Sequence, residues 1–90
     1  MNIAIVDDEK IVSETVEIFL RVYIKNFWSE YESRIHIEIF RSAKEFITFF
    51  SPKIYNLVIL GVNMQEIARF IRANDDFGVK ILFFDSCEED

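Results

Sequence analysis

The sequence contains little glycine, proline and cysteine, with two, one and one of these residues in 90 positions. So little glycine and proline, together with 51% hydrophobic residues, excludes a disordered or low-complexity chain. The single cysteine, Cys87, excludes an internal disulfide framework and predicts a reducing, cytoplasmic environment. No glycine-rich loop is present, so the sequence does not support nucleotide binding.

Long apolar runs and a basic charge balance are also absent. No apolar run comes near the ~18 residues of a membrane helix. The first residues lack the charged-then-apolar pattern of a signal region, so we expect no membrane partner. Ten basic residues stand against sixteen acidic ones, which gives a net charge of −6 and disfavours direct nucleic-acid binding by this domain. No Ser-His-Asp arrangement is visible, and we do not expect an enzyme.

The stretch IAIVDDEK at 3–10 organises the chain. Its apolar run predicts a strand that is buried on both faces, as in a parallel sheet covered by helices. The acids that follow then lie at the carboxyl end of the strand, where open α/β sheets place their ligand sites. Asp7 and Asp8 are also expected to cap the next helix, because carboxylates accept hydrogen bonds from its free N–H groups.

The chain has the size of one domain, 1–90, in which strands alternate with helices. Hydrophobic periodicity predicts strands at 2–6, 35–40, 57–60 and 80–84, and helices at about 9–28 and 65–73. Between them, a capping box at Ser42 and Glu45 opens a helix that Pro52 ends. The alternating pattern of 35–40 indicates an edge strand, and the apolar run 57–60 a central strand. This order predicts an α/β fold with a parallel sheet.

The first predicted helix has apolar residues at the three-and-four spacing of a face that packs on a sheet. These residues are Ile11, Val12, Val16, Phe19, Leu20, Tyr23 and Phe27. The chain also has ten phenylalanines, which is many for so small an interior. We therefore expect some of the rings to lie at a surface that a partner covers.

Four short motifs occur along the chain in an order that resembles a known family. They are IAIVDDE at 3–9, YNLVIL at 55–60, EIARFIR at 66–72 and KILFF at 80–84. In this order the chain resembles a response-regulator receiver domain of two-component signalling. The step FRSAKEF at 40–46 resembles receivers that are joined to LytTR-type DNA-binding domains. The resemblance implies a three-layer, flavodoxin-like fold with strand order 2-1-3-4 and three helices, without the last helix-strand-helix part of a receiver.

The resemblance also implies which residues would carry the family's chemistry. Two acids after the first strand bind Mg²⁺ in receivers, and these match Asp7 and Asp8. The phosphoacceptor position falls on Gly61, which has no side chain to act as a nucleophile, and the hydroxyl position after the fourth strand falls on Asp85. The chain ends before the strand that carries the family's lysine. Because phosphoryl transfer needs the nucleophile, the metal and charge neutralisation together, we expect no phosphorylation at this site.

Two roles remain open for the acidic residues. Asp7, Asp8 and Asp85 form one candidate set of ligands for Mg²⁺ or Ca²⁺, because hard cations prefer carboxylate oxygens. If the site receives no phosphoryl group, the protein requires no cofactor. In that alternative, Asp7 and Asp8 serve as the cap of the following helix. A third alternative gives Asp85 the role of a permanent negative charge near the site.

The last predicted strand is apolar and has no further strand to cover it. Ile81, Leu82, Phe83 and Phe84 are therefore the main candidates for a contact surface, and Phe19, Val22 and Tyr23 on the first helix are weaker ones. We interpret the chain as a phosphorylation-independent pseudo-receiver. It would act through protein–protein contact in signal transduction or transcription regulation, as a homodimer or with a partner regulator or kinase. In the alternative, the chain is the N-terminal fragment of a longer response regulator.

Overall fold

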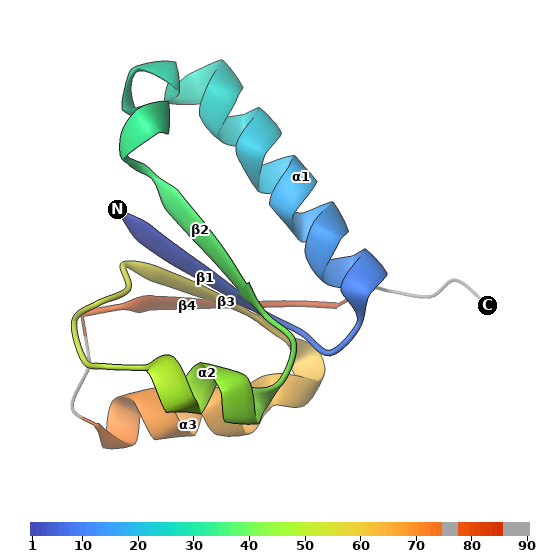
Figure 1. The fold of residues 1–90 in the computed structure, drawn as a ribbon, viewed down its shortest axis with the longest axis vertical. Coiled ribbons are helices and arrows are strands. Elements are labelled where there is room, and N and C mark those ends of the chain that lie inside the picture. Colours follow the sequence, from blue (N-terminus) through green and yellow to red (C-terminus); the bar gives the residue numbers. More distant parts are fainter. Residues whose placement is uncertain (75–77, 86–90) are drawn as a thin grey trace.

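A computed structural model describes residues 1–74 and 78–85 and has the predicted alternation of strands and helices (Figure 1). The elements are β1 (Asn2–Val6), α1 (Lys10–Phe27), the 3-10 helix η1 (Ser29–Arg34), β2 (His36–Phe40), α2 (Ala43–Phe49), β3 (Leu57–Gly61), the 3-10 helix η2 (Val62–Met64), α3 (Gln65–Ala73) and β4 (Lys80–Phe84). The predicted strands and helices are confirmed. β1, β4 and α3 have the predicted bounds, β2, β3 and α1 differ by one residue at one or both ends, and α2 ends at Phe49, before Pro52. None of the helices in the described ranges has the length and apolar character needed to cross a membrane.

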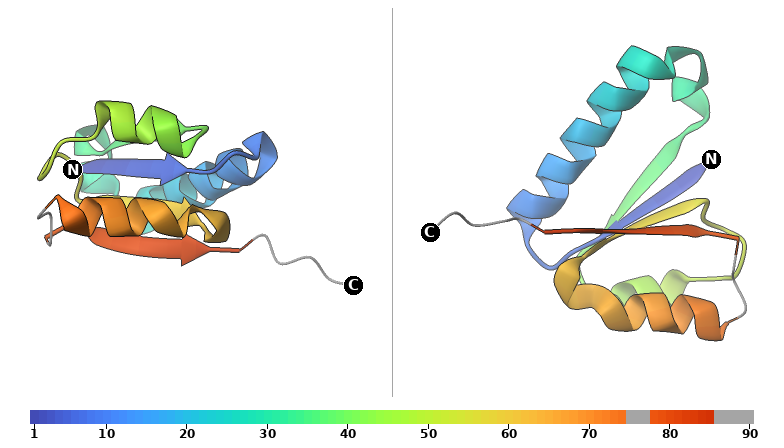
Figure 2. Two further views of the ribbon diagram at one scale, coloured as in Figure 1. Left: turned by 90° about the horizontal axis from the view of Figure 1, so that it is seen from below. Right: turned by 180° about the vertical axis from the view of Figure 1, so that it is seen from behind.

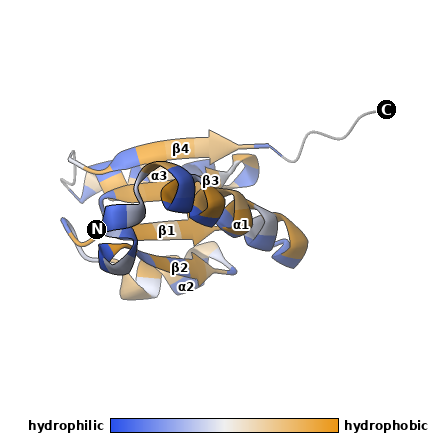
Figure 3. Cartoon of the chain, turned by 90° about the horizontal axis from the view of Figure 1, so that it is seen from above, coloured by the Kyte–Doolittle hydropathy of each residue, from blue (hydrophilic) through white to orange (hydrophobic). Residues whose placement is uncertain are grey.

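The four strands form one parallel sheet in the order β2-β1-β3-β4, as predicted. Figure 3 shows this order across the sheet, with β4 at one edge and β2 at the other. β1 pairs with both β2 and β3, and its residues from Ile3 to Val6 are at most 2% exposed. The arrangement is flavodoxin-like, and it places β1 and β3 at the centre, where their carboxyl ends meet.

Helices cover the two faces of the sheet unequally. α1 lies on one face, and α2 and α3 lie on the other (Figures 1 and 2). On the α2–α3 face, Ala4 and Val6 pack with Val58 and Leu60 in one buried cluster. On the α1 face a smaller buried cluster consists of Ile3, Ile5 and Ile59. A single helix therefore covers the face that holds the smaller cluster.

Aromatic rings fill the space between the sheet and α2. Phe46 is fully buried, and its ring centroid lies 5.3 Å from that of Phe40 and 5.8 Å from that of Tyr55. Phe50 continues the cluster towards α3, because its ring lies 5.5 Å from both Phe46 and Phe70. Such pairs add to the stabilisation from burial alone. The abundance of phenylalanine is thus explained in part by this interior.

The two helix starts differ in how well they match prediction. At α2 the capping box is confirmed, since the Glu45 N–H donates to the Ser42 Oγ at 3.0 Å. The Glu45 carboxylate in turn accepts from the Arg41 N–H at 2.9 Å, one residue earlier than in the usual motif. At α1 the expected cap is wrong, because no side chain of the described residues accepts a hydrogen bond from the N–H groups of its first turn. The Asp7 carboxylate accepts instead from the N–H of Glu9, the residue before the helix, at 2.8 Å.

The face of α1 that lies on the sheet is narrower than predicted. Ile11, Phe19, Tyr23 and Phe27 are exposed by 78%, 71%, 51% and 68%, so their predicted inward position is wrong. The residues turned towards the sheet are Val12, Ser13, Val16, Leu20 and Ile24. Apolar residues occupy most of the circumference of α1, so periodicity alone did not identify the arc that faces the sheet.

Phe46 should carry a large share of the stability of the α2–α3 face. Phe46→Ala removes a fully buried ring, and we expect it to lower the free energy of unfolding by about 3–5 kcal/mol. Phe49→Ala on the same helix is the matched control. Phe49 is 64% exposed, and its substitution should cost less than about 1 kcal/mol. Urea unfolding of both variants checks this; equal losses would contradict it.

Candidate functional site

A small acidic cavity lies at the carboxyl ends of β1, β3 and β4. Its volume is about 80 Å³, and residues from all three strand ends line it. The residues that bear on its chemistry are Asp7, Asp8, Glu9, Gly61, Asn63 and Asp85. Parallel sheets place their ligand sites at this end of the strands. The structure thus brings the three predicted carboxylates to the same cavity.

The space beside Gly61 is already occupied. Gly61 has φ −64° and ψ 153°, an extended conformation that any residue adopts, so the backbone does not require glycine here. A Cβ atom at this position would collide with the Asp7 carboxylate. Asp7 is 7% exposed and therefore has little room to turn away. The position that the resemblance assigns to the phosphoacceptor is filled by the neighbouring acid.

Burial also changes the chemistry of Asp7. Desolvation raises the pKa of its carboxyl group above the ordinary value of 3.8. The hydrogen bond from the Glu9 N–H opposes this rise, because it favours the carboxylate, and the nearby Asp8 adds to it. Asp7 thus holds its proton more tightly than an exposed aspartate.

Cation binding at this cavity stays a prediction. Across 1–74 and 78–85, no three His, Cys, Asp or Glu side chains lie close enough to form a group that could hold a metal ion. Asp7, Asp8 and Asp85 line the cavity without converging on one point. Because the pKa of Asp7 is raised, a proton competes with a cation for its carboxylate more strongly than it would at an exposed aspartate.

The predicted contact residues on β4 divide between the two faces of the sheet. Leu82 is 52% exposed on the α1 face, and Phe83 is 48% exposed on the α3 face. Ile81 and Phe84 are half-buried against the two core clusters. Figure 3 shows that β4 is mainly apolar along its length. Since β3 is its one neighbour among the described strands, β4 presents an apolar edge.

The predicted contact residues on α1 are all exposed, and one of them, Tyr23, lines an apolar groove. Phe19 is 71% exposed, and Val22 and Tyr23 are each 51% exposed. The groove has a volume of about 370 Å³ and separates the carboxyl half of α1 from the sheet. Tyr23 lines it together with Trp28, whose ring centroid lies 5.9 Å from that of Tyr23. α1 thus leaves part of its face of the sheet uncovered.

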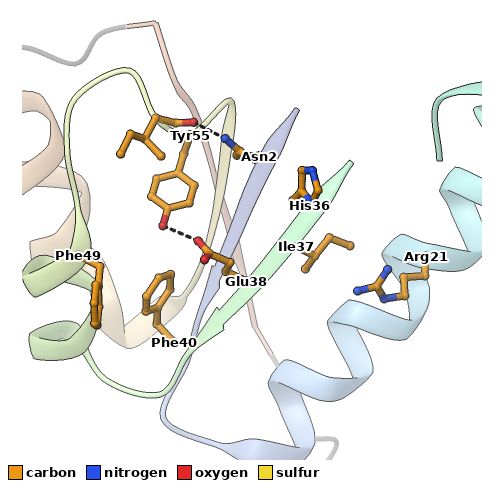
Figure 4. A pocket seen from close by; sticks show the side chains of 9 residues that line it. Asn2, Arg21, His36, Ile37, Glu38, Phe40, Phe49 and Tyr55 are labelled. Carbon is orange, nitrogen blue, oxygen red and sulfur yellow. Dashed lines mark hydrogen bonds between the residues drawn. The ribbon is translucent and has the colours of Figure 1, made fainter. Parts of the chain in front are cut away.

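A larger groove, which sequence reasoning missed, lies along the outer edge of β2. Its volume is about 710 Å³, and His36, Glu38, Phe40 and Tyr55 are among the residues that line it (Figure 4). The Tyr55 hydroxyl donates to the Glu38 carboxylate at 2.7 Å, and burial and this acid both raise the pKa of Tyr55. The alternation of polar residues on β2 was the signal for an exposed edge, but it did not indicate that Tyr55 would reach it.

Together the fold and the cavity define an α/β protein of flavodoxin-like architecture with acidic residues at the carboxyl ends of its central strands. No protein-family model, no curated protein and no solved structure matches the chain. The resemblance to receiver domains therefore rests on the sequence motifs, and the structure supports the flavodoxin-like strand order alone.

The contact between Gly61 and Asp7 can be tested by adding one methyl group. Gly61→Ala should lower the free energy of unfolding by about 1–3 kcal/mol, because the new Cβ collides with the Asp7 carboxylate. Gly78→Ala is the matched control, since no atom of the described residues, apart from its chain neighbours, lies within 4 Å of a Cβ at that position. Adding Asp7→Ala to Gly61→Ala should recover part of the loss. Equal effects at the two glycines, measured by urea unfolding, would contradict the contact.

The raised pKa of Asp7 gives stability a pH dependence of defined sign. The folded protein holds this proton more tightly than the unfolded chain does. The free energy of unfolding should therefore fall as the pH rises from 3.8 through the folded pKa of Asp7. Asp7→Asn cannot ionise and keeps an oxygen that can accept from Glu9, so it should abolish this fall and be more stable than wild type at neutral pH.

Urea unfolding of both proteins at several pH values measures the effect. Asp8→Asn is the control, because it removes a nearby charge that raises the pKa of Asp7. It should reduce the fall without abolishing it. Parallel pH profiles for wild type and Asp7→Asn would show that ionisation of Asp7 is not coupled to folding.

Proposed function

We propose that this chain is a phosphorylation-independent pseudo-receiver that acts by protein–protein contact in signal transduction or transcription regulation. The proposal rests above all on Gly61, which stands where a receiver carries its nucleophile. Phosphoryl transfer to a protein requires a nucleophilic side chain within reach of the phosphoryl group and a metal ion that neutralises its charge. Gly61 has no such side chain, and the Asp7 carboxylate occupies the adjoining space.

The apolar edge at β4 supports the second part of the proposal. An open strand edge presents unpaired N–H and C=O groups, which makes it a template for pairing with another chain. Leu82 and Phe83 place half-exposed apolar side chains on both faces of this edge. An edge of this kind suits a second copy of the chain, or the edge of a partner regulator or kinase, better than it suits a small-molecule substrate.

A cation-dependent switch is the second candidate function. The observation in its favour is that Asp7, Asp8 and Asp85 line one cavity. In the described part of the chain, however, these side chains do not converge as a ligand group, and this makes the switch the weaker candidate. Interaction through β4 requires no cation and no cofactor.

The β4 contact is tested by placing a charge on it. Phe83→Glu puts a carboxylate on the exposed edge, and it should lower the average mass in light scattering relative to wild type at equal concentration. Phe49→Glu is the matched control. Phe49 is 64% exposed on α2, away from β4, and this variant should keep the wild-type mass.

Circular dichroism shows whether each variant is folded. If folded Phe83→Glu keeps the wild-type mass, β4 is not a contact between copies. The edge is then covered by a different partner or by further elements of a longer regulator, and the proposal of self-association through β4 is wrong.

A further inference from the structure

The outer face of α1 carries a second apolar surface, separate from β4. Ile11, Thr15, Ile18 and Val22 follow one another at intervals of four, three and four residues. Ile11, Ile18 and Val22 are exposed by 78%, 62% and 51%. In a helix of 3.6 residues per turn this row lies opposite Leu20, which packs on the sheet. We call these four residues the outer seam.

The outer seam has the pattern by which two helices pair. Apolar residues at alternating intervals of three and four form the contact line of a coiled coil. Thr15 is its one polar member, and its hydroxyl donates to the Ile11 carbonyl oxygen at 2.7 Å. Burial of Thr15 would therefore leave no hydroxyl without a partner. The seam does not serve the fold, because it faces away from the sheet.

Charges beside the outer seam indicate what covers it. Glu14 and Arg21 border the seam on the same side, and both are exposed. In an antiparallel pair of α1 helices, Ile11 opposes Val22 of the second copy and Thr15 opposes Ile18. The same register places Glu14 beside Arg21 of the second copy, twice by symmetry.

The ends of α1 agree with the same direction. Lys25 lies near the carboxyl end of the helix, and Asp8 and Glu9 precede its first turn. Antiparallel pairing brings each Lys25 towards the acids of the other copy. Parallel pairing would instead set Lys25 against Lys25 and Asp8 against Asp8, which is unfavourable.

We propose that α1 pairs with α1 of a second copy of this chain, antiparallel, through the outer seam and the two Glu14–Arg21 contacts. Arg21 donates to Glu17 within its own helix at 2.8 Å, and its side chain lines the groove along β2 (Figure 4). Pairing would turn its guanidinium from this groove towards Glu14 of the second copy, to which its further N–H groups can donate. On the other side of the seam the 71% exposed Phe19 ring borders the pairing surface. This contact goes beyond the proposed function, because it involves neither β4 nor the acidic cavity.

Disulfide trapping tests the pairing and its direction. The experiments use full chains that carry Cys87→Ser, which removes the one native thiol, and Phe83→Glu, which removes the β4 contact. A mixture of Ile11→Cys and Val22→Cys chains should cross-link under mild oxidation, because antiparallel pairing places these positions opposite each other. Ile11→Cys alone should not cross-link. Its two copies would lie about 16 Å apart along the helix axis, beyond the ~7 Å limit for Cα atoms in a disulfide.

Charge reversal tests the ion pairs in the same background. Glu14→Arg should raise the dimer Kd about tenfold, because it sets like charges together twice per dimer. Adding Arg21→Glu should restore the wild-type Kd to within about twofold. Glu66→Arg, on the exposed first turn of α3, is the matched control and should leave the Kd unchanged. Sedimentation equilibrium measures each value.

The outcomes separate this inference from the proposed function. A cross-link in the mixture, none for Ile11→Cys alone, and rescue by the double charge reversal support antiparallel pairing. A cross-link for Ile11→Cys alone overturns it in favour of parallel pairing. If neither sample cross-links, or if the chain with Phe83→Glu is a monomer, the α1 contact is wrong. In both of those cases the β4 contact is tested separately, by comparing the average mass of Phe83→Glu with that of wild type.

Discussion

Burial of β1 on both of its faces is the constraint on which the rest of the structure depends. β1 pairs with β2 on one side and β3 on the other, and successive side chains alternate between the two core clusters. A shift of one residue in its register would exchange Ile3 and Ile5 with Ala4 and Val6, and so place larger and smaller side chains in the wrong layers. The register of β1 also sets where Asp7 emerges, and this places its carboxylate against Gly61.

The two layers around the sheet do not protect it equally. α2 and α3 close one face with a cluster of rings centred on the fully buried Phe46. α1 alone covers the other face, where a groove of about 370 Å³ remains and Leu82 is half exposed. Apolar surface of this kind is costly to leave in water, and on monomeric proteins large patches often mark contact sites. The same chain therefore combines a well-packed half with a half suited to association.

Sequence patterns predicted the fold well because strands alternate with helices and the sheet is buried. They failed where one helix has two apolar faces: nothing in the spacing of Phe19 and Tyr23 distinguishes a residue on the sheet from one in solvent. They also did not indicate that Ser13, a small polar residue, is fully buried with its hydroxyl donating to the Lys10 carbonyl oxygen. The absence of a side chain at Gly61, the position that the resemblance assigns to the phosphoacceptor, followed from the sequence and the resemblance. The sequence did not predict that the Asp7 carboxylate occupies the space beside Gly61, because this contact depends on side-chain positions on two different strands.

The contact between Gly61 and Asp7 also limits how this sequence can change over generations. A side chain at 61 can be accommodated once Asp7 has been replaced by a smaller residue, so placing a nucleophilic side chain there without a collision takes two coordinated substitutions. The first step alone is harmful in either order. A larger residue at 61 collides with Asp7, and a smaller residue at 7 leaves a void and removes the acceptor for the Glu9 N–H. Both routes pass through a less stable intermediate, and a marginally stable domain has little stability to lose. Single substitutions thus tend to preserve the present state of the site, in which position 61 carries no side chain.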